Sequence, residues 1–162
     1  MKKIMFTLLL LPFLASCQTT KKEAKKNVAY AVQKTDVEWK NSLPEMAYYV
    51  LRQAGTESPF TGKYNSFYKE GIYACAACKS DLYYSKDKFD SKSGWPSFDR
   101  GAIENIEFNI DYKLGYARTE LKCNTCGGHL GHMFNDGPRK TTGKRHCINS
   151  AALTFTPDST DE

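Results

Sequence analysis

Cys147 is the residue of this 162-residue chain whose sequence neighbours best suit a catalytic role. It lies in the segment Arg145-His146-Cys147-Ile148-Asn149-Ser150, and all three histidines of the chain fall within the 18 residues before it. A cysteine with histidines nearby can act as a nucleophile that has acid-base partners. A lone cysteine is more often a small buried hydrophobic residue, so its neighbours must decide between the two interpretations.

Those neighbours favour a functional cysteine. If residues 145–149 form a strand, Arg145, Cys147 and Asn149 share one face of it. His146 then points to the opposite face. A guanidinium and an amide are unusual neighbours for a cysteine in a hydrophobic core. A nearby positive charge also favours the thiolate over the thiol. We therefore expect Arg145 to lower the pKa of Cys147 and to activate it.

Four other cysteines form two pairs with the same spacing, Cys75-Ala76-Ala77-Cys78 and Cys123-Asn124-Thr125-Cys126. Each spacing lets a tight turn present two thiolates to one ion, so two such turns predict a tetrahedral four-sulfur zinc site with one zinc per chain. A site filled by four sulfurs is closed and structural, and it leaves His129 for another role. Two disulfides are the alternative, since an exported protein meets oxidising conditions.

The sixth cysteine belongs to an export signal. Lys2 and Lys3 precede an apolar run that ends in Leu14-Ala15-Ser16-Cys17, and this ending resembles the bacterial lipobox. The resemblance implies a signal peptide over residues 1–16 and lipidation of Cys17, which would anchor the protein in the bacterial cell envelope, outside the cytoplasm. Gln18 in place of aspartate slightly favours the outer membrane. The alternative is a cleaved signal whose cysteine is incidental.

Charge divides the remaining chain into a tether and a domain. Residues 17–35 hold five lysines against one glutamate and few large apolar residues, which predicts a flexible basic tether. Residues 36–162 hold 16 lysines and arginines against 17 acidic residues, so the net charge of +5 comes from the N-terminal part. A nearly neutral domain argues against nucleic acid as a partner.

The start of this domain carries the pattern of one helix. Ser42 is the expected N-cap, with Pro44 in the first turn and Glu45 completing a capping box. An apolar face follows, and Gly55 can end the helix. The residues of that face are Met46, Tyr49 and Val50.

Beyond this helix the chain predicts short strands separated by polar turns. Ile106, Phe108 and Ile110 alternate with polar residues, which is typical of a half-buried strand. The fold class is therefore mainly β, with antiparallel sheets, an N-terminal helix and a structural four-cysteine zinc site. The predicted strands cover residues 72–74, 82–85, 103–110, 116–121, 146–150 and 153–155.

Three segments together resemble the methionine-(R)-sulfoxide reductases of the B type. They are Ser93-Gly94-Trp95-Pro96-Ser97-Phe98, the run from Gly127 to Pro138 that contains Gly-His-Leu-Gly-His-Met-Phe-Asn-Asp-Gly-Pro, and the segment around Cys147. The resemblance extends from about Ser42 to Phe155 and includes both cysteine pairs. It implies the β fold of that family and reduction of methionine-(R)-sulfoxide in proteins.

The resemblance also implies roles for individual residues. Cys147 would attack the sulfoxide sulfur, and His132 and His129 would hold and protonate its oxygen. Methionine would leave as Cys147 becomes a sulfenic acid. Trp95 would pack against the methyl group of the substrate, and Arg145 would stabilise the thiolate. The remaining two, Asp136 and Asn149, would orient the histidines and water.

Two positions depart from the family pattern. Ser93 stands where members that recycle through an internal disulfide often carry a cysteine, so we expect no internal resolving cysteine. The reductant would be a thioredoxin-like domain or a small thiol, and the substrates would be oxidised envelope proteins. His146 replaces the usual aromatic residue, and we expect it to pack away from Cys147. We expect a monomer.

Two other functions fit parts of the pattern. Paired Cys-x-x-Cys turns also occur in zinc ribbons that bind nucleic acid or protein, although the neutral domain and the export signal count against a binding module. A secreted cysteine hydrolase would also use cysteine and histidine, but it needs an oxyanion hole that a sequence does not show.

Overall fold

The computed structural model describes residues 29–158, so the predicted signal peptide and Cys17 lie outside the described residues. From Tyr30 the chain already lies against the domain. The Tyr30 hydroxyl donates to a carboxylate oxygen of Glu107 (2.8 Å) and accepts from the ammonium of Lys122 (3.0 Å). The last residues of the predicted tether are therefore in contact with the domain.

A first helix, α1 (Asp36–Ser42), follows and was missed by the sequence analysis. Thr35 caps it: its hydroxyl accepts from the Glu38 N–H (3.3 Å), and the Glu38 carboxylate accepts from the Thr35 N–H (2.7 Å). This reciprocal capping box satisfies two amides that would otherwise lack partners. Trp39 is the buried residue of α1 and anchors the helix on the domain.

The predicted N-cap at Ser42 is wrong. Ser42 is the last residue of α1, where its hydroxyl donates to the Trp39 carbonyl (3.3 Å). The expected helix exists as α2 (Glu45–Gln53), but its N-cap is Pro44 and no side chain caps it. The hydroxyl of Ser42 is engaged by the preceding helix, so it is not available to the following one.

The buried face of α2 is also displaced from the predicted one. Met46 and Tyr49 are 49% and 44% exposed, and only Val50 of the three predicted positions is fully buried. Ala54 takes the left-handed C-cap conformation, and the Gly55 N–H donates to the Tyr49 carbonyl (3.0 Å) to close the helix. The buried residues of α2 are Ala47, Tyr48, Val50 and Leu51.

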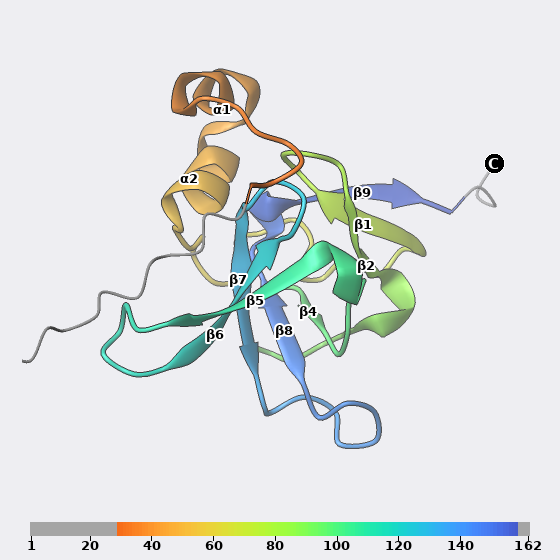
Figure 1. Cartoon of the computed structure of the whole chain (residues 1–162). Coiled ribbons are helices and arrows are strands. Elements are labelled where there is room, and N and C mark those ends of the chain that lie inside the picture. The colour runs from red at the N-terminus through yellow and green to blue at the C-terminus, as the bar shows by residue number, and fades with distance from the viewer. Residues whose placement is uncertain (1–28, 159–162) are drawn as a thin grey trace, which may run out of the picture.

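Within the described part of the chain, nine strands form two antiparallel sheets (Figure 1). The smaller sheet has the order β2-β1-β9, and the larger has the order β3-β4-β8-β7-β6-β5. The strands are β1 (Gly71–Cys75), β2 (Asp81–Tyr84), β3 (Lys88–Phe89), β4 (Ser97–Phe98), β5 (Ile106–Asp111), β6 (Arg118–Cys123), β7 (His129–Phe134), β8 (Arg145–Ile148) and β9 (Leu153–Pro157).

The mainly β antiparallel fold class is thus confirmed, with differences in detail. Strand β7 was not predicted, because its two histidines and a glycine hide the alternation of apolar residues. The alternation along β5 was misread: Ile106 is buried, whereas Phe108 and Ile110 are 37% and 66% exposed. The outer part of the β5–β6 hairpin extends beyond the core (Figure 1), which leaves Phe108 and Ile110 in contact with solvent.

The core lies where the two sheets and α2 meet. Aromatic rings from both sheets pack together in it: Tyr73 and Phe98 lie edge to face at 5.1 Å, and Tyr83 stacks on Phe98 at 4.4 Å. All three are fully buried. Among residues 29–158, no helix is long and apolar enough to cross a membrane.

Glu57 ties the loop after α2 to the end of β8. Its side chain is only 5% exposed, and its carboxylate accepts from the backbone N–H groups of Ser150 (2.6 Å) and Ala151 (2.9 Å). These amides open the 3-10 helix Ser150–Ala152 that follows β8. The loop was predicted to have no regular structure, and this carboxylate is what fixes it.

We predict that Glu57→Ala lowers the free energy of unfolding by about 2 to 4 kcal/mol, because it leaves two buried amides without an acceptor. Glu57→Gln retains one acceptor oxygen and should lose less. Urea unfolding of the two variants measures the difference. Glu104→Ala, which removes an exposed carboxylate, is the control and should change stability by no more than about 0.5 kcal/mol. Equal stability of Glu57→Ala and wild type would contradict this role.

Candidate functional site

Cys147 lies on a central strand of the larger sheet. Strand β8 pairs with β4 on one side, where Cys147 faces Ser97, and with β7 on the other, where it faces His132. Directly opposed residues of antiparallel strands have Cβ atoms about 4.5 to 5.5 Å apart. The pairing therefore sets a histidine and a hydroxyl beside the thiol, and β7 and β8 run side by side through the centre of the sheet (Figure 1).

Gly131 makes this close pairing possible. A Cβ atom at this position would lie 2.0 Å from the carbonyl oxygen of Cys147, a distance that backbone cannot accommodate. Without a side chain there, β7 approaches β8 closely and leaves open space beside the thiol. Gly131 itself lines that space.

The space is a pocket of about 160 Å³. Trp95 forms one wall, and its indole N–H donates to the Glu57 carbonyl (3.1 Å), which fixes the ring. The volume suits a single side chain better than a drug-sized ligand, which needs about 300 Å³ or more. The lining residues are Thr56, Trp95, Arg118, Gly131, His132, Phe134, Cys147 and Asn149.

Arg145 lies next to Cys147 and is held in place by two contacts. Its guanidinium donates two hydrogen bonds to the Asp136 carboxylate (2.9 Å each) and lies over the Phe134 ring at 4.5 Å. Asp136 was expected to orient a histidine; the structure places it on Arg145 instead. The bidentate geometry fixes the guanidinium, and Arg145 holds the pKa of Asp136 below its usual range.

The expectation that Arg145 lowers the pKa of Cys147 is met only in part. Burial raises the pKa of the Cys147 thiol, and this outweighs the lowering by the Arg145 charge and by the Ser93 hydroxyl. The net pKa is therefore raised from its ordinary value. A buried thiol pays a desolvation penalty on ionising, so activation needs every group that stabilises negative charge.

His132 is oriented by a carboxylate that the sequence analysis did not select. Its Nε2 atom lies 2.8 Å from Oδ2 of Asp111, at the end of β5, and Asp111 also pairs with Arg118. Burial lowers the pKa of His132, while Asp111 opposes that shift. The contacts of Asp111, with the Lys113 backbone first among them, hold its own pKa at about 2, so it stays ionised.

His129 has a similar partner. Its Nδ1 lies 2.6 Å from the Glu120 carboxylate, and its ring is 5.4 Å from that of His132. The hydrogen bond with His129 lowers the pKa of Glu120. Among the described residues the Nε2 atom of His129 is buried without a hydrogen-bond partner, so its hydrogen-bonding capacity is unused there.

Asn149 and His146 have structural contacts. Asn149 ends β8: its Oδ1 accepts from the Glu57 N–H (3.0 Å) and its amide donates to the Leu130 carbonyl (2.9 Å). Among the described residues its side-chain hydrogen bonds go to backbone and none goes to a histidine, so they do not support the expected role in orienting histidines, although Asn149 lines the pocket. His146 packs away from Cys147 as expected, with Nδ1 3.3 Å from the Tyr83 hydroxyl, and burial lowers its pKa to about 4.

The four remaining described cysteines come together in one cluster. Their sulfurs all lie within 4.8 Å of one another, so they could hold a metal ion. Two of the contacts cross between the pairs: Cys75 to Cys126 at 3.8 Å and Cys78 to Cys123 at 3.5 Å. These distances far exceed the S–S bond of about 2.05 Å, and all four thiols are free, so the disulfide alternative is not what the structure contains.

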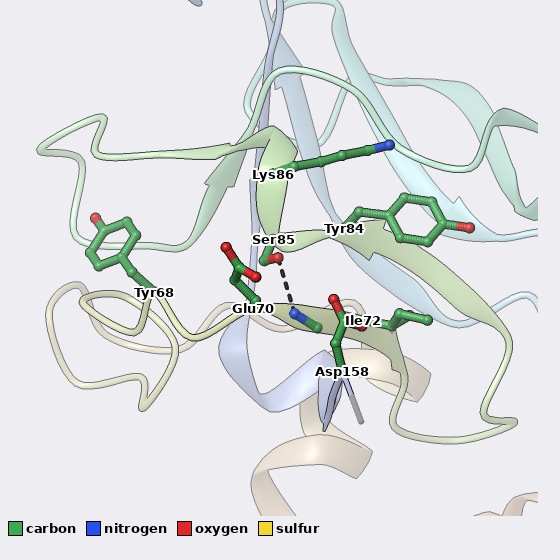
Figure 2. Close-up of a pocket in the computed structure, with 8 residues that line it drawn as sticks. Tyr68, Glu70, Ile72, Tyr84, Ser85, Lys86 and Asp158 are labelled. Carbon is green, nitrogen blue, oxygen red and sulfur yellow. Dashed lines mark hydrogen bonds between the residues drawn. The ribbon is translucent and has the colours of Figure 1, made fainter. Parts of the chain in front are cut away.

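A larger cavity, of about 460 Å³, lies elsewhere, beside β1 and β2 (Figure 2). Figure 2 shows the Ser85 hydroxyl accepting from the Gly71 N–H (3.0 Å), with Glu70, Lys86 and Asp158 around it. Its lining includes no cysteine and no histidine. The chemistry therefore belongs to the smaller pocket at Cys147.

Comparison with known proteins points to the same family that the sequence resembles. Residues 43–157 match the model of the SelR domain. The chain belongs to the B-type methionine-R-sulfoxide reductases. A peptide methionine sulfoxide reductase MsrB of Leifsonia xyli subsp. xyli is 49% identical over 130 residues, covering 80% of this chain and 94% of that protein. The probable methionine-R-sulfoxide reductase B of Caenorhabditis elegans is 43% identical over 147 residues, covering 85% of this chain and 97% of that protein.

As a member of this family, the chain is an oxidoreductase that reduces methionine-R-sulfoxide. Three site residues of this reductase escaped the sequence analysis: Asp111, Arg118 and Glu120. The last two share the segment Arg118-Thr119-Glu120, and their alternation on a strand next to the histidine segment was the signal that could have found them. A binding module alone would have no need of paired carboxylates behind two histidines.

We predict that Asp111→Asn moves the alkaline limb of the kcat profile to lower pH. The carboxylate raises the pKa of His132, so its loss lowers that pKa further, and the protonated histidine is then lost at lower pH. At neutral pH kcat should fall roughly 10- to 100-fold. The measurement is kcat against pH with a methionine-(R)-sulfoxide substrate.

The control is Asp81→Asn, which neutralises an exposed carboxylate on β2 and should leave the profile unchanged. An unshifted profile for Asp111→Asn would show that Asp111 does not act through His132.

Proposed function

We propose that this reductase works through direct attack of the Cys147 thiolate on the sulfoxide sulfur. The sulfoxide oxygen passes to the cysteine sulfur and takes up one proton, so Cys147 becomes a sulfenic acid and the sulfoxide is reduced by two electrons to methionine. The observation that carries this proposal is the position of Cys147 in a pocket with His132 directly opposite and Trp95 as a wall.

The two histidines supply the proton. His132 lines the pocket and is held by Asp111, and His129 lies behind it with a free buried nitrogen. An acid within hydrogen-bond reach of the oxygen lowers the barrier as negative charge develops there. Arg145 stabilises the thiolate before the attack, and the Trp95 ring packs against the methyl group of the substrate.

An external thiol reduces the sulfenic acid. Ser93 holds the position beside Cys147, with its hydroxyl 3.8 Å from the sulfur, and a serine forms no disulfide. The other described cysteines are gathered in the four-sulfur cluster. Two thiols of a thioredoxin-like domain, or two small thiols, then reduce the sulfenic acid to the thiol and release water as they form a disulfide.

We predict that the enzyme reduces dabsyl-methionine-(R)-sulfoxide with dithiothreitol and leaves the (S) epimer untouched, and that Cys147→Ser abolishes the activity. After one turnover without reductant, mass spectrometry should find the Cys147 peptide heavier by one oxygen. A disulfide from Cys147 to any cysteine of the four-sulfur cluster would refute external reduction of the sulfenic acid, and turnover of the (S) epimer alone would refute the assigned stereochemistry.

The four-cysteine cluster is proposed to hold one structural zinc ion. Zinc binds thiolates at about 2.3 Å, and the edges of a tetrahedron of that size measure about 3.8 Å. The sulfur contacts of 3.5 Å and 3.8 Å between the two pairs fit this geometry. Each pair forms the same turn: Lys79 and Gly127, one residue after the second cysteine, have positive φ and donate to the carbonyl of the first.

The zinc site would join the two sheets, because one pair follows β1 and the other lies between β6 and β7. We predict a content of one zinc per chain by elemental analysis. The double variant Cys75→Ser with Cys123→Ser should lose both the metal and the folded state, since zinc binding contributes to folding free energy. Full activity and stability of a metal-free, chelator-treated protein would contradict a structural zinc.

We further propose that the protein is a monomeric lipoprotein of the bacterial envelope that repairs oxidised proteins there. The supporting observation is the lipobox-like ending Leu14-Ala15-Ser16-Cys17 after a short apolar run. In the native bacterium, Cys17→Ser should prevent lipidation. The reductase should then accumulate as the unprocessed precursor and be lost from the membrane fraction. Unchanged membrane fractionation and unchanged mass of the variant would count against lipidation.

A further inference from the structure

Three serine hydroxyls lie in a row that ends at the Cys147 thiol. The Ser93 oxygen is 3.8 Å from the Cys147 sulfur and 2.8 Å from the Ser91 oxygen. The Ser91 oxygen is 2.7 Å from the Ser97 oxygen, and Ser97 lies within 3.2 Å of the Trp95 carbonyl. All these contacts are within hydrogen-bond range for their atom types.

The row has a direction, because each hydroxyl has one proton to donate. With Cys147 as a thiol, its S–H donates to Ser93, Ser93 to Ser91, Ser91 to Ser97, and Ser97 to the Trp95 carbonyl. Every donor then has an acceptor. In this arrangement the hydroxyls stabilise the neutral thiol.

When the hydrogen bonds run in the opposite direction, the row stabilises the thiolate of Cys147. Ser97 then donates to Ser91, Ser91 to Ser93, and Ser93 to the negative sulfur. Only hydroxyl rotations separate the two arrangements, and the one bond given up is that from Ser97 to the Trp95 carbonyl. The Ser93 N–H donates to the Ser91 oxygen (3.3 Å) in both, which keeps the row in place.

We propose that Ser93, Ser91 and Ser97 form a reversible hydroxyl chain that stabilises the Cys147 thiolate, with Ser93 as the residue that contacts the sulfur. The inference rests on the proposed role of Cys147 as nucleophile. It assigns a function to Ser93. Serine cannot act as a resolving thiol, but its hydroxyl supplies a hydrogen bond to the Cys147 sulfur.

Burial makes this contribution necessary. Desolvation raises the pKa of Cys147, and the structure provides two groups that oppose it, the Arg145 charge and the Ser93 hydroxyl. The Arg145 guanidinium is shared with Asp136, which offsets part of its charge. The Ser93 hydroxyl has no competing acceptor for its proton once the chain reverses, because Ser91 then donates to Ser93 and does not accept from it.

The test measures the rate of Cys147 alkylation by iodoacetamide against pH, in full-length zinc-loaded protein without any sulfoxide, by mass spectrometry of the Cys147 peptide. Ser93→Ala should move the midpoint up by about one pH unit, the effect of one hydrogen bond to a charged group. Ser91→Ala should move it in the same direction by less, because Ser93 then lacks its donor. Ser93→Thr retains the hydroxyl and should restore the wild-type midpoint.

Ser66→Ala, which removes an exposed serine hydroxyl outside the chain, is the matched control and should leave the midpoint unchanged. If the alkylation midpoint of Ser93→Ala equals that of the wild type, the whole proposal is wrong. If the midpoint shifts in Ser93→Ala but not in Ser91→Ala, Ser93 acts alone and the proposed hydroxyl chain is wrong. Zinc content and circular dichroism of each variant confirm folding. Because no sulfoxide is present, these outcomes are independent of whether the proposed reduction mechanism holds.

Discussion

The site depends on the hydrogen bonding of β8 to a strand on each side. This pairing fixes the backbone at Cys147 and places Ser97 on one side of it and His132 on the other. The thiol there is partly buried, and desolvation raises its pKa. The position that orients Cys147 thus disfavours its thiolate, and the proposed role as nucleophile requires the surrounding groups to stabilise that thiolate. Arg145 and the serine hydroxyls are the groups placed to do so.

Each cationic or potentially cationic group of the site lies against a carboxylate, and Arg118 and His132 share that of Asp111. Arg145 has Asp136, and the two histidines have the carboxylates at the end of β5 and on β6. Such pairs hold the side chains in one geometry before substrate arrives, which avoids the cost of ordering them during the reaction. They also keep the pocket from accumulating positive charge, so an uncharged sulfoxide side chain can enter without competing anions.

Local signals in the sequence predicted the parts of the molecule that are local in space. The spacing of the cysteine pairs predicted their clustering, and the alternation around Cys147 predicted that His146 would face away from it. Glu57 carried no signal, because its partners lie more than 90 residues away. Asp111 likewise meets His132 only through the pairing of β5, β6 and β7. At Ser42 the local signal was ambiguous, since the preceding helix used the same hydroxyl.

The architecture also constrains the order of events at Cys147. The Cys147 side chain lines the pocket that contains Trp95 and His132, so the sulfur is reached from that pocket. That pocket, about 160 Å³, has room for one side chain. In the proposed mechanism an external thiol therefore enters by the path that the substrate used, and only after methionine has left. With a serine beside the sulfur, the proposed sulfenic acid would link the two half-reactions, and this order predicts ping-pong kinetics.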